Sequence, residues 1–274
     1  MKITFYGTRG SIPVPEPDYV EFGGNTACIL LTFNTGRIAI IDAGTGIRKL
    51  GNDLIEQGHQ QFDDIVLGLS HTHWDHIQGF PFFKPAYDSR RHFTISIGGR
   101  DHTNASLESI FAAQMEQEYF PIPLHGMGAR FDFWQPDPNA VNDLRGIKLK
   151  ATELNHPGGA FGYRIEEDGK SIVYCTDVEH GPEIDQRVVE LAFECDLLIH
   201  DAQYTPAELN DKKGWGHSSW EQAAEVADLA KVERLVLFHH DPEHNDAFLK
   251  MIEKDCRSVF RNTVSAREGM TIDI

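Results

Sequence analysis

Short apolar runs that end in polar residues alternate along this chain with segments of helical periodicity. Such runs cover residues 1–6, 27–33, 37–41, 65–69, 147–154, 161–166, 171–176, 196–200 and 235–238. Helical patterns follow Gly46, cover about 220–230 and begin again near Asn245. An alternation of strands and helices favours a layered α/β fold over a helix bundle or an all-β sandwich.

Residues 81–145 are the least regular part of the chain. Proline-rich stretches surround one segment of helical spacing, residues 104–119, and we interpret 81–145 as an insertion or lid over the site. No linker-like stretch and no repeat of 20–50 residues divides the sequence, so a single domain over 1–274 is expected. Asp168-Gly169 predicts a hairpin turn between two strands.

The charge and the cysteines narrow the classes of function. The 274 residues include 42 acidic and 25 basic side chains, a formal net charge of −17, which would repel a long nucleic acid. The four cysteines form no C-x-x-C pair and the N-terminus carries no apolar signal region, so we expect a protein of the reducing cytoplasm. No apolar run approaches the ~18 residues of a membrane span, and no membrane association is expected.

Histidine is the unusual component, with 14 residues, and its densest cluster follows the apolar run 65–69. There the sequence HTHWDH (residues 71–76) places three imidazoles and a carboxylate within six positions. Imidazole binds Zn, Fe, Mn or Ni, and several ligands from one loop lower the entropy cost of assembling a site. A histidine-rich surface loop without metal is the alternative.

This H-x-H-x-D-H pattern resembles the metallo-β-lactamase superfamily. The resemblance implies an αββα sandwich of two mixed sheets with outer helices. It also implies two divalent metal ions, zinc in the first place, with manganese, iron or cobalt as alternatives. Later ligands would follow later strands: Asn155-His156-Pro157, Thr176-Asp177 and His239-His240-Asp241 each end an apolar run.

The resemblance therefore assigns a ligand set. His71, His73 and His156 would bind one metal, Asp75, His76 and His239 the other, and Asp177 would bridge them.

Three of the assignments have alternatives. Strand alternation lets only one of His239 and His240 face the metals, and we favour His239 as the first polar residue after the strand. His156 alone would also fit a buried core histidine. Asp42 resembles the family's acid that orients a metal-binding histidine, but its position equally fits a helix N-cap.

A second motif, Gly214-Trp215-Gly216-His217-Ser218-Ser219, narrows the resemblance to the RNase Z-like phosphodiesterase branch. In that branch the motif's histidine protonates the leaving alkoxide, a role that suits the pKa of histidine. His217 and Asp75 are therefore the predicted catalytic residues. A turn with an exposed histidine and a helix cap is the other interpretation of this motif.

Four further polar residues are expected to contact substrate. Ser218 and Ser219 precede a helix whose N-terminus would favour phosphate. Arg9 and Asn25 lie in N-terminal turns that also resemble this branch, although an arginine flanked by glycine also fits a solvated turn. His59, His92, His102, His125, His180 and His244 lie in polar or irregular stretches and are expected to be exposed.

The resemblance also limits the substrate. RNase Z grips tRNA with a long arm between the ligand histidine and the bridging aspartate, but His156 and Asp177 are only 21 positions apart in this chain. The chain resembles the cyclic-nucleotide phosphodiesterases of the branch, including the anti-Pycsar type. We therefore expect a 3′,5′-cyclic nucleotide as substrate and, as in the branch, a homodimer. The alternatives are a tRNA 3′-end endonuclease, a lactonase or thioesterase, and a metal-binding module without catalysis.

Overall fold

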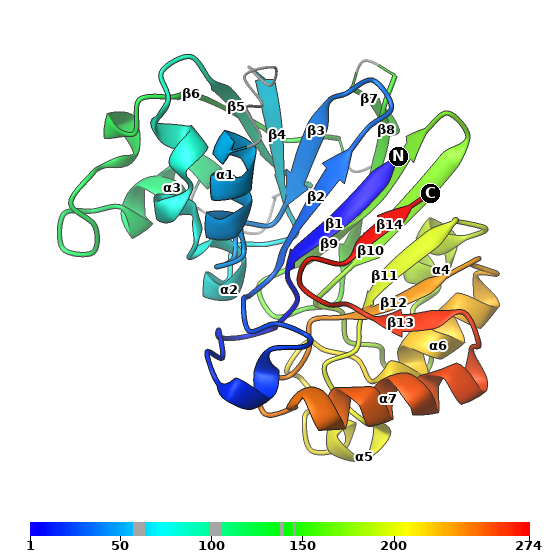
Figure 1. Cartoon of the computed structure of the whole chain (residues 1–274). Helices are drawn as coiled ribbons and strands as arrows, with labels where there is room; N and C mark the ends of the chain where they lie inside the picture. The colour runs from blue at the N-terminus through cyan, green and yellow to red at the C-terminus, as the bar shows by residue number, and fades with distance from the viewer. Residues whose placement is uncertain (57–63, 99–105, 138–139, 145) are drawn as a thin grey trace.

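Two β-sheets lie face to face with helices on their outer sides (Figure 1). The computed structural model describes residues 1–56, 64–98, 106–137, 140–144 and 146–274. Within these residues each sheet contains seven strands. The architecture confirms the αββα sandwich of two mixed sheets that the sequence resemblance implies.

The first sheet has the strand order β14-β1-β2-β3-β4-β5-β6. Strands β14, β1, β2 and β3 pair antiparallel, and β3, β4, β5 and β6 pair parallel. The bounds are β1 Lys2–Gly7, β2 Cys28–Thr32, β3 Ile38–Ile41, β4 Asp64–Leu69, β5 His92–Ile97, β6 Arg130–Trp134 and β14 Thr271–Asp273.

The second sheet has the order β13-β12-β11-β10-β9-β8-β7. Strands β10 to β13 are parallel, and β7 to β10 are antiparallel. The bounds are β7 Asn142–Asp143, β8 Lys148–Leu154, β9 Ala160–Glu167, β10 Lys170–Cys175, β11 Leu197–Asp201, β12 Leu235–Phe238 and β13 Thr263–Ser265. Asp168 and Gly169 both have positive φ, 53° and 78°, in the predicted turn between β9 and β10.

The helices cover the outer faces of the sheets, α1 and α3 beside the first and α4, α6 and α7 beside the second (Figure 1). Their bounds are α1 Ile47–Glu56, α2 Trp74–Ile77, α3 Leu107–Gln114, α4 Gln186–Ala192, α5 Pro206–Leu209, α6 Trp220–Leu229 and α7 Asp246–Val259. Short 3₁₀ turns lie at Pro17–Tyr19, Phe80–Phe82, Lys84–Tyr87 and Leu124–Gly126. Among the described residues, no helix has the length and apolar character needed to cross a membrane.

The main core lies between the sheets. Phe5 of β1 faces Phe238 of β12 with ring centroids 6.0 Å apart, and Tyr174 of β10 packs on the same ring at 5.6 Å. Burying one such aromatic side chain contributes about 1.5–3 kcal/mol. The apolar residues of the short strands are therefore used to join the two sheets, and a second cluster packs α4, α6 and α7 on the second sheet.

Residues 81–145 differ from their sequence interpretation. β5 pairs with β4 along six residues and β6 pairs with β5, so both strands continue the first sheet rather than cover the site. The helix predicted at 104–119 is shorter, Leu107–Gln114, and starts with a Ser106 side-chain cap on Ser109. Positions 104 and 105 lie outside the described residues.

The pairing directions bring several strand ends to one edge. β3 is parallel to β4, and β10 is parallel to β11 and β12. β8 runs in the direction of β10 because both pair antiparallel with β9. Polar residues after these strands therefore meet at the same edge of the sandwich.

Candidate metal centre

The loop after β4 supplies the first group of site residues. β4 ends at Leu69, and Ser70 to His73 lead directly into α2, which carries Asp75 and His76. His71, Asp75 and His76 are buried, with 2%, 6% and 0% exposure. A short helix that starts next to a strand end keeps all these side chains close to one point.

Three later strands deliver the remaining residues. His156 follows β8, Asp177 follows β10 and His239 follows β12. Asp177 and His239 adopt left-handed backbone conformations, φ 55° and 60°. Non-glycine residues in this region cost of order 1–3 kcal/mol and cluster at functional sites. The chain thus accepts backbone strain where it turns these two side chains inward.

Four donor atoms meet in the first of two clusters. The Nε2 atoms of His76 and His239 lie 3.2 Å apart. Asp75 Oδ2 lies 3.3 Å from His76 Nε2 and 3.2 Å from His239 Nε2. Asp177 Oδ2 lies 3.3 Å and 3.4 Å from the same two nitrogens.

These spacings fit a tetrahedral metal ion. Zinc binds imidazole and carboxylate at about 2.0–2.2 Å, which corresponds to ligand-to-ligand distances of about 3.3–3.6 Å in a tetrahedron. His76 Nδ1 faces the Asp42 carboxylate at 2.9 Å and His239 Nδ1 faces Gln203 Oε1 at 3.0 Å. Both Nδ1 atoms therefore donate, and when the rings are neutral the two facing Nε2 atoms carry lone pairs that can bind a metal ion.

The second cluster is formed by three histidines and the other oxygen of Asp177. His156 Nε2 lies 3.1 Å from His73 Nδ1 and 3.9 Å from Asp177 Oδ1. His71 Nε2 lies 3.7 Å from Asp177 Oδ1 and is a buried nitrogen without a hydrogen-bond partner in the described structure. His156 Nδ1 donates to the Gly216 carbonyl at 2.9 Å, so its Nε2 is also free to bind a metal.

The electrostatics of these groups fit the same purpose. Burial holds the pKa of His71 well below its usual value, and the neighbouring histidines add to the effect, so the imidazole is in its neutral, metal-binding form. Burial also lowers the pKa of His76, but Asp177, Asp75 and Asp42 outweigh it and raise the pKa well above normal. The carboxylates around His76 thus create a field that favours positive charge.

Asp42 connects the first sheet to this cluster. Its carboxylate contacts His76 Nδ1 and accepts hydrogen bonds from Ser70 and from the Tyr174 hydroxyl at 2.7 Å. The helix-cap interpretation does not hold, because α1 begins at Ile47 and the carboxylate bonds Ser70, His76 and Tyr174 instead. Asp42 therefore fixes the orientation of the His76 imidazole.

The turn after β1 closes one side of the cluster. The backbone N–H of Ser11 donates to Asp75 Oδ2 at 2.8 Å. A Cβ added at Gly10 would lie 2.4 Å from the His239 ring, so no larger residue fits at that position without moving the imidazole. The glycine of this turn is thus required by close approach to a site residue.

His217 lies beside both clusters. Its Nδ1 is 2.7 Å from Asp201 Oδ2, and its ring centroid lies 5.0 Å from His239 and 5.3 Å from His156. Burial lowers the pKa of His217, but the Asp201 carboxylate outweighs that effect and raises it to about 9. The ring is 8% exposed, so its protonated form is held at the edge of the site.

His240 takes no part in either cluster. Its Nε2 lies 3.0 Å from the Ala266 carbonyl and its ring packs edge-on against Phe22. Of the two adjacent histidines, His239 is the one that the structure brings to Asp75 and Asp177.

The four predicted substrate contacts are hydrogen-bonded to other parts of the protein. Arg9 is fully buried and donates to the carbonyls of Gly23, Asp241 and His244. Asn25 donates to Glu268. Ser218 donates to the Val178 carbonyl and Ser219 caps α6. All four side chains have protein partners, which leaves the prediction of substrate contacts without geometric support.

The prediction of exposed histidines is wrong at two positions. His180 and His244 are only 5% and 4% exposed. His180 Nε2 lies 3.4 Å from His200 Nε2, and His244 Nε2 lies 2.9 Å from Glu208. Polar neighbours in the sequence did not reveal these partners from distant strands and helices. His125 is exposed and His92 half-buried, whereas His59 and His102 lie outside the described residues.

Sequence reasoning also missed residues that hold the site. Asp201 ends β11, two positions after the apolar run 197–199, but the predicted strand stopped at 200. Glu179 accepts the backbone N–H groups of Gly214 and Gly216, both at 2.8 Å, and so fixes the loop that carries His217. No short motif announces Glu179.

The fold and the two donor clusters define a metallohydrolase of the αββα class. Residues 37–240 match the family model of the beta-lactamase superfamily domain, and the chain belongs to this metallo-β-lactamase superfamily, in its RNase Z-like branch. It is a metal-dependent hydrolase.

Relatives and solved structures agree with this assignment. Ribonuclease Z of Picrophilus torridus is 25% identical, with 100% of this chain and 96% of the relative covered. Ribonuclease Z of Archaeoglobus fulgidus is 27% identical, with 100% and 97% covered. The structure of human tRNase Z, short form, is similar at a TM-score of 0.70, 22% identity and coverage of 100% and 99%. Yeast PDE1 is similar at a TM-score of 0.67, 13% identity and coverage of 100% and 99%.

Proposed function

We propose that this protein is a dinuclear metal phosphodiesterase that hydrolyses a small phosphodiester, a 3′,5′-cyclic nucleotide. The observation that carries the proposal is the His217–Asp201 pair next to two donor clusters that share Asp177. Zinc is the proposed metal, since the spacing of the four-atom cluster suits its tetrahedral coordination.

The metals and His217 divide the chemistry. Two divalent ions, when bound, supply activated water and offset the charge of the phosphate. The chain's own contribution is a proton: His217 carries one, and Asp201 holds its Nδ1–H, so Nε2–H can point to the leaving oxygen. As water adds to phosphorus, the bond from phosphorus to the ribose oxygen breaks and that oxygen takes the proton from His217.

Two features support a small substrate: the net charge of the chain and the short segment between His156 and Asp177. The net charge of −17 disfavours a long nucleic acid. Between His156 and Asp177 the chain forms the β9–β10 hairpin and no arm. A cyclic nucleotide carries one charge, which two metal ions can neutralise, whereas folded tRNA would need a wide basic surface.

The full-length similarity to proteins named ribonuclease Z supports a second candidate, cleavage of precursor tRNA at its 3′ end. The test incubates the metal-loaded protein with cAMP, cGMP, cCMP, cUMP and precursor tRNA in parallel, with bis-p-nitrophenyl phosphate as generic ester. Turnover of at least one cyclic nucleotide and none of tRNA is expected. Cleavage of tRNA alone would establish the second candidate, and turnover of the generic ester alone would reject the cyclic-nucleotide substrate.

Lactonase and thioesterase activity is tested in the same experiment. A thiolate leaves from a thioester without a proton more readily than a ribose alkoxide leaves from a phosphodiester. Hydrolysis of a homoserine lactone or an acyl thioester that is insensitive to His217→Ala would favour those functions over the proposed one.

A further inference from the structure

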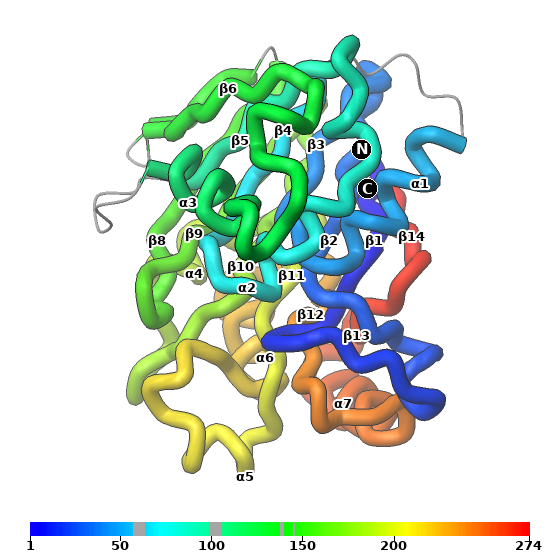
Figure 2. Tube along the Cα trace, turned by 90° about the vertical axis from the view of Figure 1, so that its left-hand side faces the viewer, coloured from blue at the N-terminus to red at the C-terminus, as the bar shows by residue number. Residues whose placement is uncertain are grey.

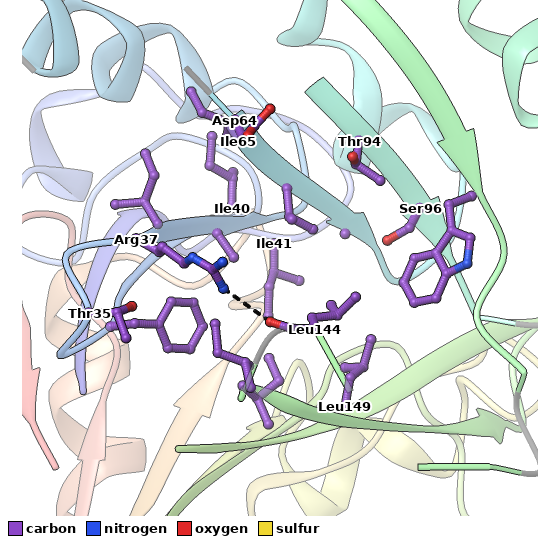
Figure 3. Close-up of a pocket in the computed structure, with 18 of the residues that line it drawn as sticks. Thr35, Arg37, Ile40, Ile41, Asp64, Ile65, Thr94, Ser96, Leu144 and Leu149 are labelled. Atoms are coloured by element: carbon purple, nitrogen blue, oxygen red, sulfur yellow. Dashed lines mark hydrogen bonds between the residues drawn. The ribbon is translucent and has the colours of Figure 1, made fainter. Parts of the chain in front are cut away.

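A cavity separate from the metal clusters lies between the two sheets (Figure 3). It measures about 640 Å³, within the range of small-molecule sites. It runs along β4 and β5, with β3 on one side and β8 and β9 of the other sheet opposite. Figure 2 views the molecule from the side on which β5, β6 and α3 lie.

The β4 and β5 side of the cavity includes two small residues, Gly68 and Ser96. β4 lies between β3 and β5, yet Val66 and Gly68 on this central strand are partly exposed. A Cβ added at Gly68 would meet no atom nearer than 3.9 Å. A central strand that faces a second sheet normally has both faces buried. The side chains at this place therefore do not fill the space between the two sheets.

One hydroxyl on the cavity wall could hydrogen-bond to a bound molecule. Ser96 is 4% exposed and lines the cavity, and none of the described residues forms a hydrogen bond with its hydroxyl. In Figure 3 its oxygen faces the open volume, near Thr94 and across from Arg37. A hydroxyl that reaches the open volume can hydrogen-bond to water or to a bound molecule.

Charged residues are confined to the outer end. Asp64 and His92 begin β4 and β5, and their side chains pair at 2.8 Å. Arg37 donates to the Leu144 carbonyl at 3.2 Å on the same side. Deeper in, the wall consists of Ile40, Val66, Leu149 and Ile165 beside Ser96, and no side chain that lines this part carries a charge. Such a wall favours an uncharged molecule.

We propose that this cavity binds a neutral, mainly apolar small molecule that hydrogen-bonds to Ser96. The inner end also includes Tyr163, whose hydroxyl donates to the Leu69 carbonyl at 2.5 Å. Leu69 is two residues from His71, so an occupant would touch the support of the metal-binding loop. The outer end of the cavity lies at the amino ends of β4 and β5, away from the metal clusters, and the proposal does not depend on the proposed phosphodiesterase activity.

Two matched fluorescent probes test the proposal on the metal-loaded full chain. N-phenyl-1-naphthylamine is neutral, and 1-anilinonaphthalene-8-sulfonate has the same skeleton with a negative charge. The neutral probe is expected to bind saturably at one site, and the sulfonate at least tenfold more weakly. Absence of saturable binding of the neutral probe, or equal binding of both probes, would overturn the proposal.

Substitutions locate the binding. Gly68→Val fills the inner cavity at a strand position where β-branched residues are favoured, and is expected to weaken binding of the neutral probe at least tenfold. Gly181→Val is the control, since a Cβ there also meets nothing within 4 Å but lies outside the cavity. Thr94→Leu fills the same space from β5, and circular dichroism checks that each variant folds. Filled variants that fold and bind like the wild type would refute the assignment.

Discussion

His217 Nδ1 lies 2.7 Å from a carboxylate oxygen of Asp201, and the same carboxylate accepts N–H groups from Val178, Gln203 and Ser218. Four donors thus keep a fully buried carboxylate ionised and fixed. Burial raises the pKa of Asp201, but His217 outweighs it and lowers the pKa below normal.

Asp201→Asn should lower kcat by about 10²–10⁴-fold, because the amide no longer holds the protonated imidazole in position. KM and metal content should change little, since Asp201 is not among the proposed ligands. Steady-state kinetics and metal analysis measure both, with Asp228→Asn on the exposed face of α6 as control. A parallel loss of bound metal would show that Asp201 is instead part of the metal site.

Asp42→Asn should reduce metal affinity by about 10–100-fold, because His76 loses the carboxylate that fixes its orientation. Competition with a chromogenic chelator gives the affinity. Asp53→Asn, which removes a surface carboxylate paired with Lys49, is the matched control. Unchanged affinity in Asp42→Asn would mean that Ser70 and the fold alone orient His76.

Gly10→Ala should displace His239, because the new methyl group would lie 2.4 Å from its ring. We expect loss of about one bound metal per chain and at least tenfold lower activity, by the same logic as loss of a ligand-orienting group. Gly181→Ala, with open space around it, should behave like the wild type. Full metal content in Gly10→Ala would place His239 outside the ligand set.

Chelation should destabilise the protein. Without metal, the buried His71 Nε2 has no hydrogen-bond partner, and the carboxylates of Asp75 and Asp177 crowd around His76 and His239. Binding at a ligand concentration 1,000-fold above Kd adds about 4 kcal/mol of stability, so thermal unfolding with EDTA should occur at least about 5 °C below the zinc-loaded protein. Equal melting temperatures would contradict a preformed metal site.

His180 should make stability depend on pH. Burial lowers its pKa from the usual 6.5 to about 3, and His200 adds to the shift. The unfolded chain binds the proton below about pH 6.5 but the folded chain does not, so stability falls as pH drops from 6.5 towards 3. The folded His180→Gln variant lacks this histidine, so its free energy of unfolding should fall less over this pH range. The difference from the wild type should be up to about 1.4 kcal/mol per pH unit. Urea unfolding at each pH measures this stability, and the use of chelated protein removes any effect of metal loss. Identical slopes of stability against pH in the wild type and His180→Gln would contradict the lowered pKa of His180.

Strands with continuous apolar runs could be predicted from the sequence. The run 235–238 matches β12 and 65–69 lies within β4, because parallel strands buried on both faces contain few polar residues. β5 and β6 were missed since HFTISI and RFDFW mix polar with apolar residues inside an irregular stretch. Their polar side chains are accommodated by the cavity and the outer end of the sheet.

The site residues also divide into those that could be predicted from the sequence and those that could not. Residues placed directly after strands, such as His71, Asp177 and His239, could be predicted as neighbours because parallel strands end at one edge. Partners such as Glu179, Gln203 and Tyr174 could not, since their roles depend on hydrogen bonds to residues distant in the sequence, which have no local pattern.

The most direct test of His217 as the general acid compares the activity of His217→Ala on two substrates. A ribose alkoxide needs a proton to leave, whereas p-nitrophenolate leaves without one. We expect His217→Ala to lose about 10²–10⁴-fold in kcat on a cyclic nucleotide and less than tenfold on bis-p-nitrophenyl phosphate, with unchanged metal content. An equal loss on both substrates, or full activity of His217→Ala on the cyclic nucleotide, would contradict His217 as the general acid.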